Sequence, residues 1–135
     1  EHELTRLRLE VSRHERFADK VNEVLRGTVI AGCGFEFIKY GEETAIMRAA
    51  VCAWELGVGA TGRNAGARAK HNPGGLMRGG KLITFATWED GIRFQAHLIE
   101  RLWPKARRPE DLKGYCKGTP QSWIDGVRQG MELAR

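Results

Sequence analysis

Residues 44–56, with the sequence TAIMRAAVCAWEL, form the most apolar segment of the chain and decide its fold. Apolar side chains occur on almost every side of the helix that this segment predicts, which is typical of a helix buried at the centre of a domain. One acidic residue, Glu55, stands near the end of the segment, directly before a glycine-rich stretch. The sequence therefore predicts a central helix that carries a carboxylate at its C-terminal end.

An amphipathic helix is predicted ahead of the central one, over residues 2–26. Its apolar residues recur at steps of three and four or their multiples, and they are Leu4, Leu7, Val11, Ala18, Val21 and Leu25. Gly27 is a typical stop for a helix, and a short helix is predicted over residues 35–40 after a glycine-broken loop. The pattern leaves open whether residues 1–26 pack on the domain, link it to another part or dock onto a different chain.

The stretch after the central helix is predicted to turn rather than to form a helix or a strand. Residues 57–75 contain six glycines, which argue against any regular element there. Two short runs, residues 76–77 and 81–85, then flank Arg78-Gly79-Gly80, and the Gly-Gly pair supplies the positive φ angles of a hairpin turn. A small β-hairpin is therefore expected directly after the glycine-rich stretch.

Helices are predicted again in the last part of the chain. Thr87 is a typical N-cap and Pro104 a typical stop, so a helix is expected between them, with an apolar stripe of Ile92, Ala96, Ile99 and Trp103. A short helical piece is expected over residues 110–115, and a last helix with Pro120 at its first position. The fold class that follows is mainly α (α+β): a helical domain with one small β-hairpin, preceded by an N-terminal amphipathic helix.

The composition narrows the classes of function. The chain has 135 residues, which fits one domain, and a net charge of +5, which favours an anionic partner. The basic residues are scattered, so nucleic-acid binding is not expected. No stretch approaches the roughly 20 apolar residues of a membrane helix, and the first residues do not resemble a signal peptide. Structural zinc is not expected, because Cys33, Cys52 and Cys116 form no CxxC unit.

Glu55 is the first candidate for chemistry. An apolar environment raises the pKa of a carboxyl group, and a raised pKa is what a general acid needs near neutral pH. The negative end of the helix would raise it further. The alternatives are a carboxylate that reaches solvent at a frayed helix end, and one that pairs with an arginine.

The turn His71-Asn72-Pro73-Gly74-Gly75 is the second candidate, because these residues require a tight turn of special geometry. Asn72 could orient either the backbone or a substrate amide. Glu89 and Asp90 could supply a second carboxylate, although their place at a helix start favours capping. Trp88 could stack on a sugar or belong to the core. No metal site is expected, because the histidines form no pair at ligand spacing.

The motifs taken together point to a known family. In chain order they are AGCG (31–34), FEFIKYG (35–41), WELG (54–57), NPGGLM (72–77) and FATWEDGI (85–92), followed by Tyr115 and Trp123. Their order and spacing resemble the glucosaminidase domain of bacterial and phage cell-wall hydrolases, an endo-β-N-acetylglucosaminidase family with a lysozyme-like fold. The resemblance covers about residues 25–127, and NPGGLM followed by FATWEDGI is its most specific part.

The resemblance implies roles for individual residues. Glu55 matches the catalytic glutamate of the family, the general acid, although Glu55-Leu56-Gly57 stands where the family usually has Glu-Ser-Gly or Glu-Thr-Gly. Tyr115 matches a late tyrosine that points into the sugar cleft, and it is expected to take part in catalysis. His71 stands where many relatives have a second asparagine. Substrate binding is expected from the NPGG turn and its neighbours, namely Asn72, Gly74, Gly75, Met77 and Trp88.

The function that the resemblance implies is hydrolysis of a β-1,4 glycosidic bond of peptidoglycan by residues 27–135, without a cofactor or metal. No clear second acid is visible, so the acetamido oxygen of an N-acetyl sugar is expected to assist. One alternative is a lysozyme or lytic transglycosylase that acts on the muramic acid bond. Another is a non-catalytic wall-binding component of a phage tail or secretion machine.

The expected partners and location follow from these functions. Glycan strands of peptidoglycan are the expected substrate, and the +5 charge suits an anionic cell wall. Residues 1–26 are expected to form a helix outside the catalytic domain, which could dock onto another protein. The expected location is extracellular, in the cell wall, or in a tail-associated part of a phage virion.

Overall fold

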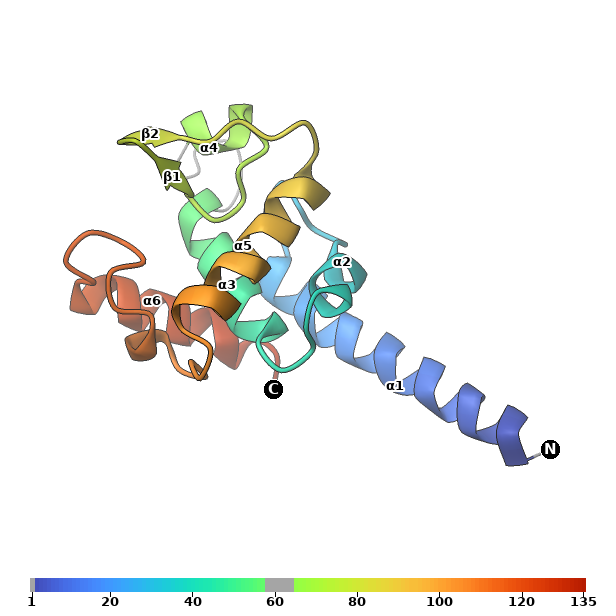
Figure 1. Cartoon of the computed structure of the whole chain (residues 1–135). Helices are drawn as coiled ribbons and strands as arrows, with labels where there is room; N and C mark the ends of the chain where they lie inside the picture. Colours follow the sequence, from blue (N-terminus) through green and yellow to red (C-terminus); the bar gives the residue numbers. More distant parts are fainter. Residues whose placement is uncertain (1, 58–64) are drawn as a thin grey trace.

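The computed structural model describes residues 2–57 and 65–135 of the chain (Figure 1). The described residues form α1 (His2–Leu25), α2 (Gly34–Lys39), α3 (Ala45–Leu56), α4 (Ala65–Ala69), β1 (Met77–Arg78), β2 (Lys81–Leu82), α5 (Trp88–Leu102), the 3₁₀ turn η1 (Pro109–Asp111) and α6 (Gln121–Glu132). This mainly helical fold with one small antiparallel hairpin confirms the predicted fold class.

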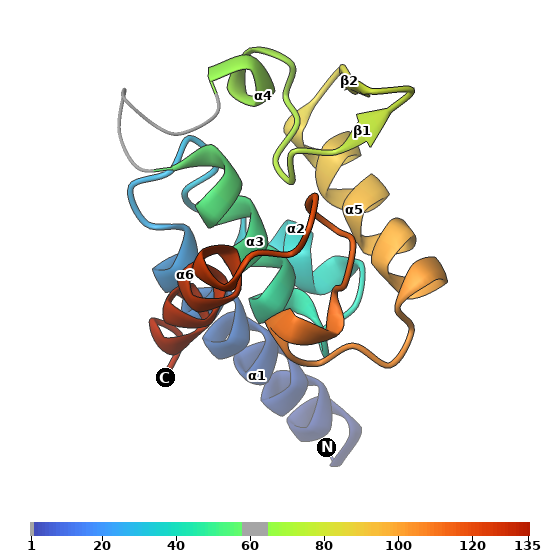
Figure 2. The same cartoon turned by 90° about the vertical axis from the view of Figure 1, so that its left-hand side faces the viewer.

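Helix α3 lies in the middle of the domain, with α6 to one side, as Figures 1 and 2 both show. Helices α1, α2 and α6 all contact it. Most of its residues are buried, and they are Ala45, Met47, Arg48, Ala49, Ala50, Val51, Cys52 and Leu56. Close approach to α6 depends on Gly126, where any Cβ would overlap the ring of Trp54. The prediction of a buried central helix is therefore confirmed.

Arg48 is a buried cation inside this core, and its partners are neutral groups. Its Nη2 donates to the carbonyl oxygens of Phe37, at 2.9 Å, and Gly41, and its Nε donates to the Thr44 hydroxyl at 2.8 Å. Phe37 lies in α2 and Gly41 just beyond its end, where carbonyl oxygens lack helical donors. Burial lowers the pKa of Arg48 to about 10, so the side chain stays charged at neutral pH. Arg48 therefore ties the end of α2 to α3.

Helix α1 has two different halves. Its C-terminal half enters the core, where Val21, Val24 and Leu25 are at most 2% exposed. Its N-terminal half projects from the domain (Figure 1), and Leu4 and Leu7 are about half exposed there, at 52% and 47%. The core thus continues across the boundary predicted after residue 26. None of the described helices has the length and apolar character needed to cross a membrane.

Three local predictions differ from the structure. Helix α4 forms within the glycine-rich stretch, because its sequence AGARA supplies three alanines, the strongest helix formers. Residues 70–75 form turns as predicted, and residues 58–64 of the same stretch lie outside the described residues. The helical piece predicted over residues 110–115 is one 3₁₀ turn over Pro109–Asp111. The last helix begins at Gln121, and Pro120 is its N-cap residue rather than its first helical residue.

The hairpin and the cap of α5 agree with the sequence. Met77 pairs with Leu82 and Arg78 with Lys81, and the two glycines between them have φ angles of +60° and +78°. The Thr87 hydroxyl accepts a hydrogen bond from the backbone N–H of Asp90 at 3.1 Å, as an N-cap does. Figures 1 and 2 show the hairpin and α4 on the same side of the domain, the side toward which the C-terminal end of α3 points. This arrangement brings the turn His71–Gly75 next to Glu55.

Candidate active site

Glu55 lies at the end of α3, between α6 and the glycine-rich turn. The indole N–H of Trp123, on α6, donates to Glu55 Oε1 at 3.2 Å. On the other side, a Cβ placed on Gly75 would lie only 2.9 Å from Glu55 Oε2. The side chain is partly buried. The carboxylate is therefore held between an indole donor and the backbone of the turn.

Asn72 holds the turn together from inside. It is fully buried, and its Nδ2 donates to the carbonyl oxygens of Leu76 at 2.8 Å and Ile83 at 3.0 Å. Its Oδ1 accepts from the backbone N–H of Leu76 at 2.8 Å. These hydrogen bonds use both ends of the Asn72 amide to join the residues directly before and directly after the hairpin. The structure thus gives Asn72 a turn-forming role, and its part in substrate binding stays a prediction.

Three glycines let the turn approach its neighbours closely. A Cβ on Gly74 would overlap the Tyr115 hydroxyl, and a Cβ on Gly91 would overlap the ring of Pro73. Gly75 has a φ angle of +65°, which side chains rarely tolerate. Gly91, on α5, belongs to the FATWEDGI motif but received no role from the sequence. Its role is to let α5 lie directly against the turn.

Tyr115 contacts both the turn and Trp123. Its hydroxyl donates to the carbonyl oxygen of Gly74 at 2.9 Å, and its ring stacks on Trp123 with a centroid distance of 5.8 Å. Burial raises the pKa of Tyr115 well above its ordinary value, so the phenol stays protonated at neutral pH. The structure therefore brings Tyr115 next to the Glu55 site, as expected. Its hydroxyl stabilises the turn through the hydrogen bond to Gly74.

Gln95 is a site residue that sequence reasoning missed. It is fully buried on α5, and its Nε2 donates to the Tyr115 hydroxyl at 3.1 Å. A signal was present in the sequence, because Gln95 lies within the apolar stripe that contains Ile92, Ala96 and Ile99. A polar residue at such a position must find hydrogen-bond partners inside the protein. Those partners are elements of the candidate site.

The remaining predicted site residues lie around this centre. Met77, on β1, is 57% exposed. Trp88 begins α5, and its ring packs edge-on against His71 at a centroid distance of 5.2 Å. His71 has a φ angle of +51°, and its Nδ1 lies 3.2 Å from the carbonyl oxygen of Phe85. Trp88 therefore packs against His71, the first residue of the turn, where the turn meets the start of α5.

The two acids at the start of α5 are paired with cations. Lys39 Nζ and the Tyr40 hydroxyl donate to Glu89 Oε1 at 3.1 Å and 3.3 Å, and the hydrogen bond from Lys39 lowers the pKa of Glu89. Asp90 accepts from Arg93 at 3.0 Å. These contacts link α5 to α2 and stabilise the first turn of α5. They agree with a structural role for both acids.

The cysteines are free, and two of them, Cys52 and Cys116, lie near the site. Cys52 is buried, whereas Cys33 and Cys116 are partly buried. Burial and the charge of Glu55 both raise the pKa of the Cys116 thiol. Among residues 2–57 and 65–135, no group of three His, Cys, Asp or Glu side chains is placed to hold a metal ion.

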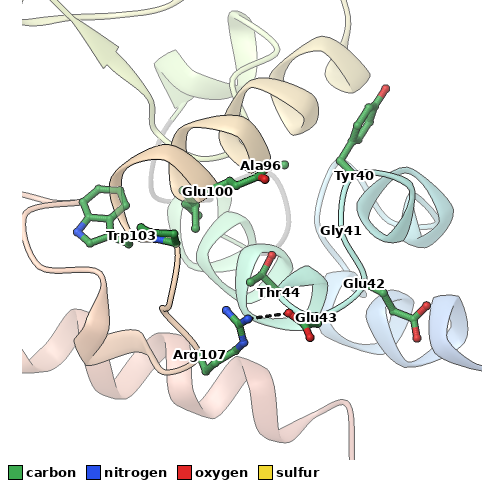
Figure 3. Close-up of a pocket in the computed structure, with 11 residues that line it drawn as sticks. Tyr40, Gly41, Glu42, Glu43, Thr44, Ala96, Glu100, Trp103 and Arg107 are labelled. Atoms are coloured by element: carbon green, nitrogen blue, oxygen red, sulfur yellow. Dashed lines mark hydrogen bonds and ion pairs between the residues drawn. The ribbon is translucent and has the colours of Figure 1, made fainter.

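A separate cavity of about 260 Å³ lies between the α2–α3 connection and the end of α5 (Figure 3). Arg107 and Glu43 form an ion pair at 2.6 Å beside it. Tyr40 and Trp103 supply aromatic surface, and Glu42 and Glu100 supply further carboxylates. None of the residues predicted for catalysis or substrate binding is among the 11 that line this cavity. The cavity is therefore distinct from the candidate site around Glu55.

No protein-family model, curated protein or solved structure matches the chain. The motifs WELG, NPGGLM and FATWEDGI supply Glu55, the NPGG turn and Gly91, whereas Gln95, Tyr115 and Trp123 lie outside these three motifs.

Proposed function

We propose that the chain is a peptidoglycan hydrolase of the N-acetylglucosaminidase type, which cleaves a β-1,4 glycosidic bond with Glu55 as general acid. One observation carries the proposal: the Glu55 carboxyl lies between the Trp123 indole and Gly75 of the NPGG turn. A fixed, partly buried carboxyl group is what protonation of a glycosidic oxygen requires. The proposal also rests on the resemblance of the motifs, which assigns the same residue.

In the first chemical step, the carboxyl proton of Glu55 is transferred to the glycosidic oxygen. As the C–O bond to the leaving sugar breaks, positive charge grows at the anomeric carbon, and Glu55 becomes a carboxylate. The Trp123 N–H, which lies 3.2 Å from Oε1, then donates to a charged acceptor, and such hydrogen bonds are stronger than neutral ones. Trp123 thus stabilises the product of proton transfer.

The group that stabilises the anomeric carbon is proposed to come from the substrate. Glu89 and Asp90 are held in ion pairs with Lys39 and Arg93, which leaves them poorly suited to that task. The acetamido oxygen of an N-acetyl sugar can attack the anomeric carbon instead, forming a cyclic intermediate. Water then opens this intermediate, while Glu55 accepts a proton from the water and returns to its acid form.

The experiment compares the parent protein with Glu55→Gln on purified peptidoglycan. Glu55→Gln keeps the shape of the side chain and removes its proton donor, so hydrolysis should fall by at least about 100-fold, the contribution typical of general acid catalysis. Glu100→Gln is the matched control, because Glu100 is an exposed acid on the separate cavity, and this variant should keep the parent rate. A Glu55→Gln variant that is folded and as fast as the parent would contradict the proposal.

The products of the same digest identify the bond that is cut. A reducing-end glucosamine in the mass spectrum supports the N-acetylglucosaminidase type. A reducing muramic acid indicates a lysozyme, and an anhydro-muramic product indicates a lytic transglycosylase. Either of these products would correct the bond while leaving Glu55 as the acid. An enzyme that acts on this substrate would work outside the cell, in the cell wall or on a phage virion.

A second candidate function is a non-catalytic wall-binding component of a phage tail or secretion machine. The exposed apolar residues in the projecting half of α1 favour it, because a partner could cover Leu4, Leu7 and Val11. In that case the parent protein would bind peptidoglycan in a sedimentation assay but release no product. Glu55→Gln would then bind as well as the parent.

A further inference from the structure

The buried amide of Gln95 connects several parts of the candidate site. Its Nε2 lies 3.4 Å from the carbonyl oxygen of Arg48 and 3.1 Å from the Tyr115 hydroxyl. Its Oε1 accepts from the Cys52 thiol at 3.4 Å. The side chain thus links α5 to α3 and to the segment that carries Tyr115. Burial of an amide is costly unless its polar atoms find partners, and here both ends find them.

The partners fix which way each hydrogen bond runs. The carbonyl oxygen of Arg48 can only accept, so it requires the amide nitrogen of Gln95 on its side. Burial raises the pKa of Cys52, which keeps the thiol protonated and able to donate to the amide oxygen. The amide nitrogen then donates to the Tyr115 hydroxyl, whose own proton is directed to the carbonyl oxygen of Gly74, 2.9 Å away.

The last contact in this series is the one between the backbone of the turn and the Glu55 carboxylate. Gly74 sits directly on the Gln95–Tyr115 pair, since a Cβ there would lie 3.1 Å from Gln95 Nε2 and would overlap the Tyr115 hydroxyl. The next residue, Gly75, lies against Glu55 Oε2. Any shift of the Gly74 carbonyl therefore moves the backbone that faces the acid.

We propose that Gln95 is a positioning residue for the reaction: it orients the hydroxyl of Tyr115, which in turn holds the Gly74–Gly75 turn against Glu55. The inference rests on the proposed function and adds a residue that the motifs do not assign. Gln95 acts through Tyr115, so its effect should disappear when the Tyr115 hydroxyl is absent.

The experiment is a double-mutant cycle with Gln95→Met and Tyr115→Phe. Methionine keeps the length of the side chain without the amide, and phenylalanine keeps the ring without the hydroxyl. On soluble peptidoglycan fragments, each single variant should lower kcat by about 10- to 100-fold with little change in KM, as small misplacements of reacting groups do. The double variant should be no slower than Tyr115→Phe. Additive losses in kcat, or a parent-like kcat for Gln95→Met, would overturn the inference.

Two controls separate positioning from stability. Ile99→Val removes one methylene from another buried residue of α5 and should leave kcat unchanged. Gln95→Asn keeps the amide but shortens its reach, and it should behave like Gln95→Met; it also serves as the second variant if methionine lowers the folded fraction. If Gln95→Asn and Ile99→Val lower kcat equally, Gln95 has only a structural role.

A readout that does not depend on activity completes the test. In ¹⁵N-labelled protein, the amide resonances of Gly74 and Gly75 should move in the same direction in Gln95→Met and Tyr115→Phe. Unmoved resonances would overturn the inference even if kcat falls. A fully active Glu55→Gln variant would instead overturn the proposed function, and the shared shift of the glycine amides would still decide whether Gln95 positions the turn.

Discussion

At the scale of single residues, Glu55 depends on neighbours from opposite parts of the chain. Trp123 donates to one carboxylate oxygen from α6, and Gly75 faces the other from the turn after α4. Tyr115 joins these two sides, because it stacks on Trp123 and bonds to Gly74. The environment of the acid is thus shared between Gly75 and Trp123, which are 48 positions apart, and a change in either of them affects the carboxylate.

Cys116 can report the charge of Glu55 without any substrate. The pKa of its thiol is raised by burial and by the negative charge of Glu55, which both disfavour the reactive thiolate. Glu55→Gln removes that charge, so the pKa of Cys116 should fall toward its ordinary value. We expect iodoacetamide to alkylate Cys116 several-fold faster in this variant at pH 8, as followed by peptide mass spectrometry.

Cys33 provides the internal control for this experiment. The pKa of its thiol is raised by burial and by Glu36, and not by Glu55. Its alkylation rate should therefore be the same in the parent and in Glu55→Gln. Equal rates for Cys116 in the two proteins would show that the charge of Glu55 does not raise the pKa of this thiol, contrary to the prediction.

At the scale of the elements, the contact between α3 and α6 is set by glycines of α6. A Cβ on Gly126 would overlap the ring of Trp54, whereas a Cβ on Gly130 would lie 3.2 Å from the Cβ of Ala50. Alanine usually stabilises a helix relative to glycine, so overlap has to outweigh that gain at position 126. Comparing the stability of alanine variants at these two positions therefore distinguishes the effect of helix propensity from the effect of packing.

We expect Gly126→Ala to lower the free energy of unfolding by about 1–3 kcal/mol, the usual cost of overpacking a core. Gly130→Ala should cost less, because Ala50 has to move by only a few tenths of an ångström. Urea unfolding followed by tryptophan fluorescence measures both. A Gly126→Ala variant as stable as the parent would mean that α6 and Trp54 can separate freely.

The sequence predicted those elements whose signals are local. The apolar run before Glu55, the Gly79-Gly80 turn and the Thr87 cap each specify their structure within a few residues. The short α4 was missed, because its alanines lie among the glycines of one stretch. Gln95, Gly91 and Gly126 received no role from the sequence, since each acquires its importance from a partner far along the chain. Contacts of this kind are not encoded in a periodic pattern, and only Gln95 left a signal, as a polar residue within the apolar stripe of α5.

The two halves of α1 should contribute differently to the stability of the protein, so two truncations should have different effects. Removal of residues 1–12 takes away the exposed side chains of residues 2–11 and the local ion pair between Arg6 and Glu3. The free energy of unfolding should change by less than about 0.5 kcal/mol, as for surface changes in general. Activity on peptidoglycan should equal that of the full chain.

Removal of residues 1–25 should instead prevent folding, because Val21, Val24 and Leu25 would leave the core and each lost side chain costs about 2–5 kcal/mol. Circular dichroism and thermal unfolding distinguish the two truncations. If the shorter truncation also unfolds the protein, the projecting half of α1 contributes to the domain itself. If it abolishes activity alone, this half takes part in engaging the substrate.

The backbone that faces Glu55 and Tyr115 has a consequence for how the site tolerates sequence change. Gly74, Gly75 and Gly91 contribute no functional group, yet each occupies space that a side chain would need. In a saturation library, these three positions should therefore be as intolerant as Glu55, whereas exposed Met77 should accept many residues. At these positions, tolerance to substitution depends on the space available as much as on chemistry. Intolerance to substitution would therefore not distinguish these glycines from catalytic residues such as Glu55.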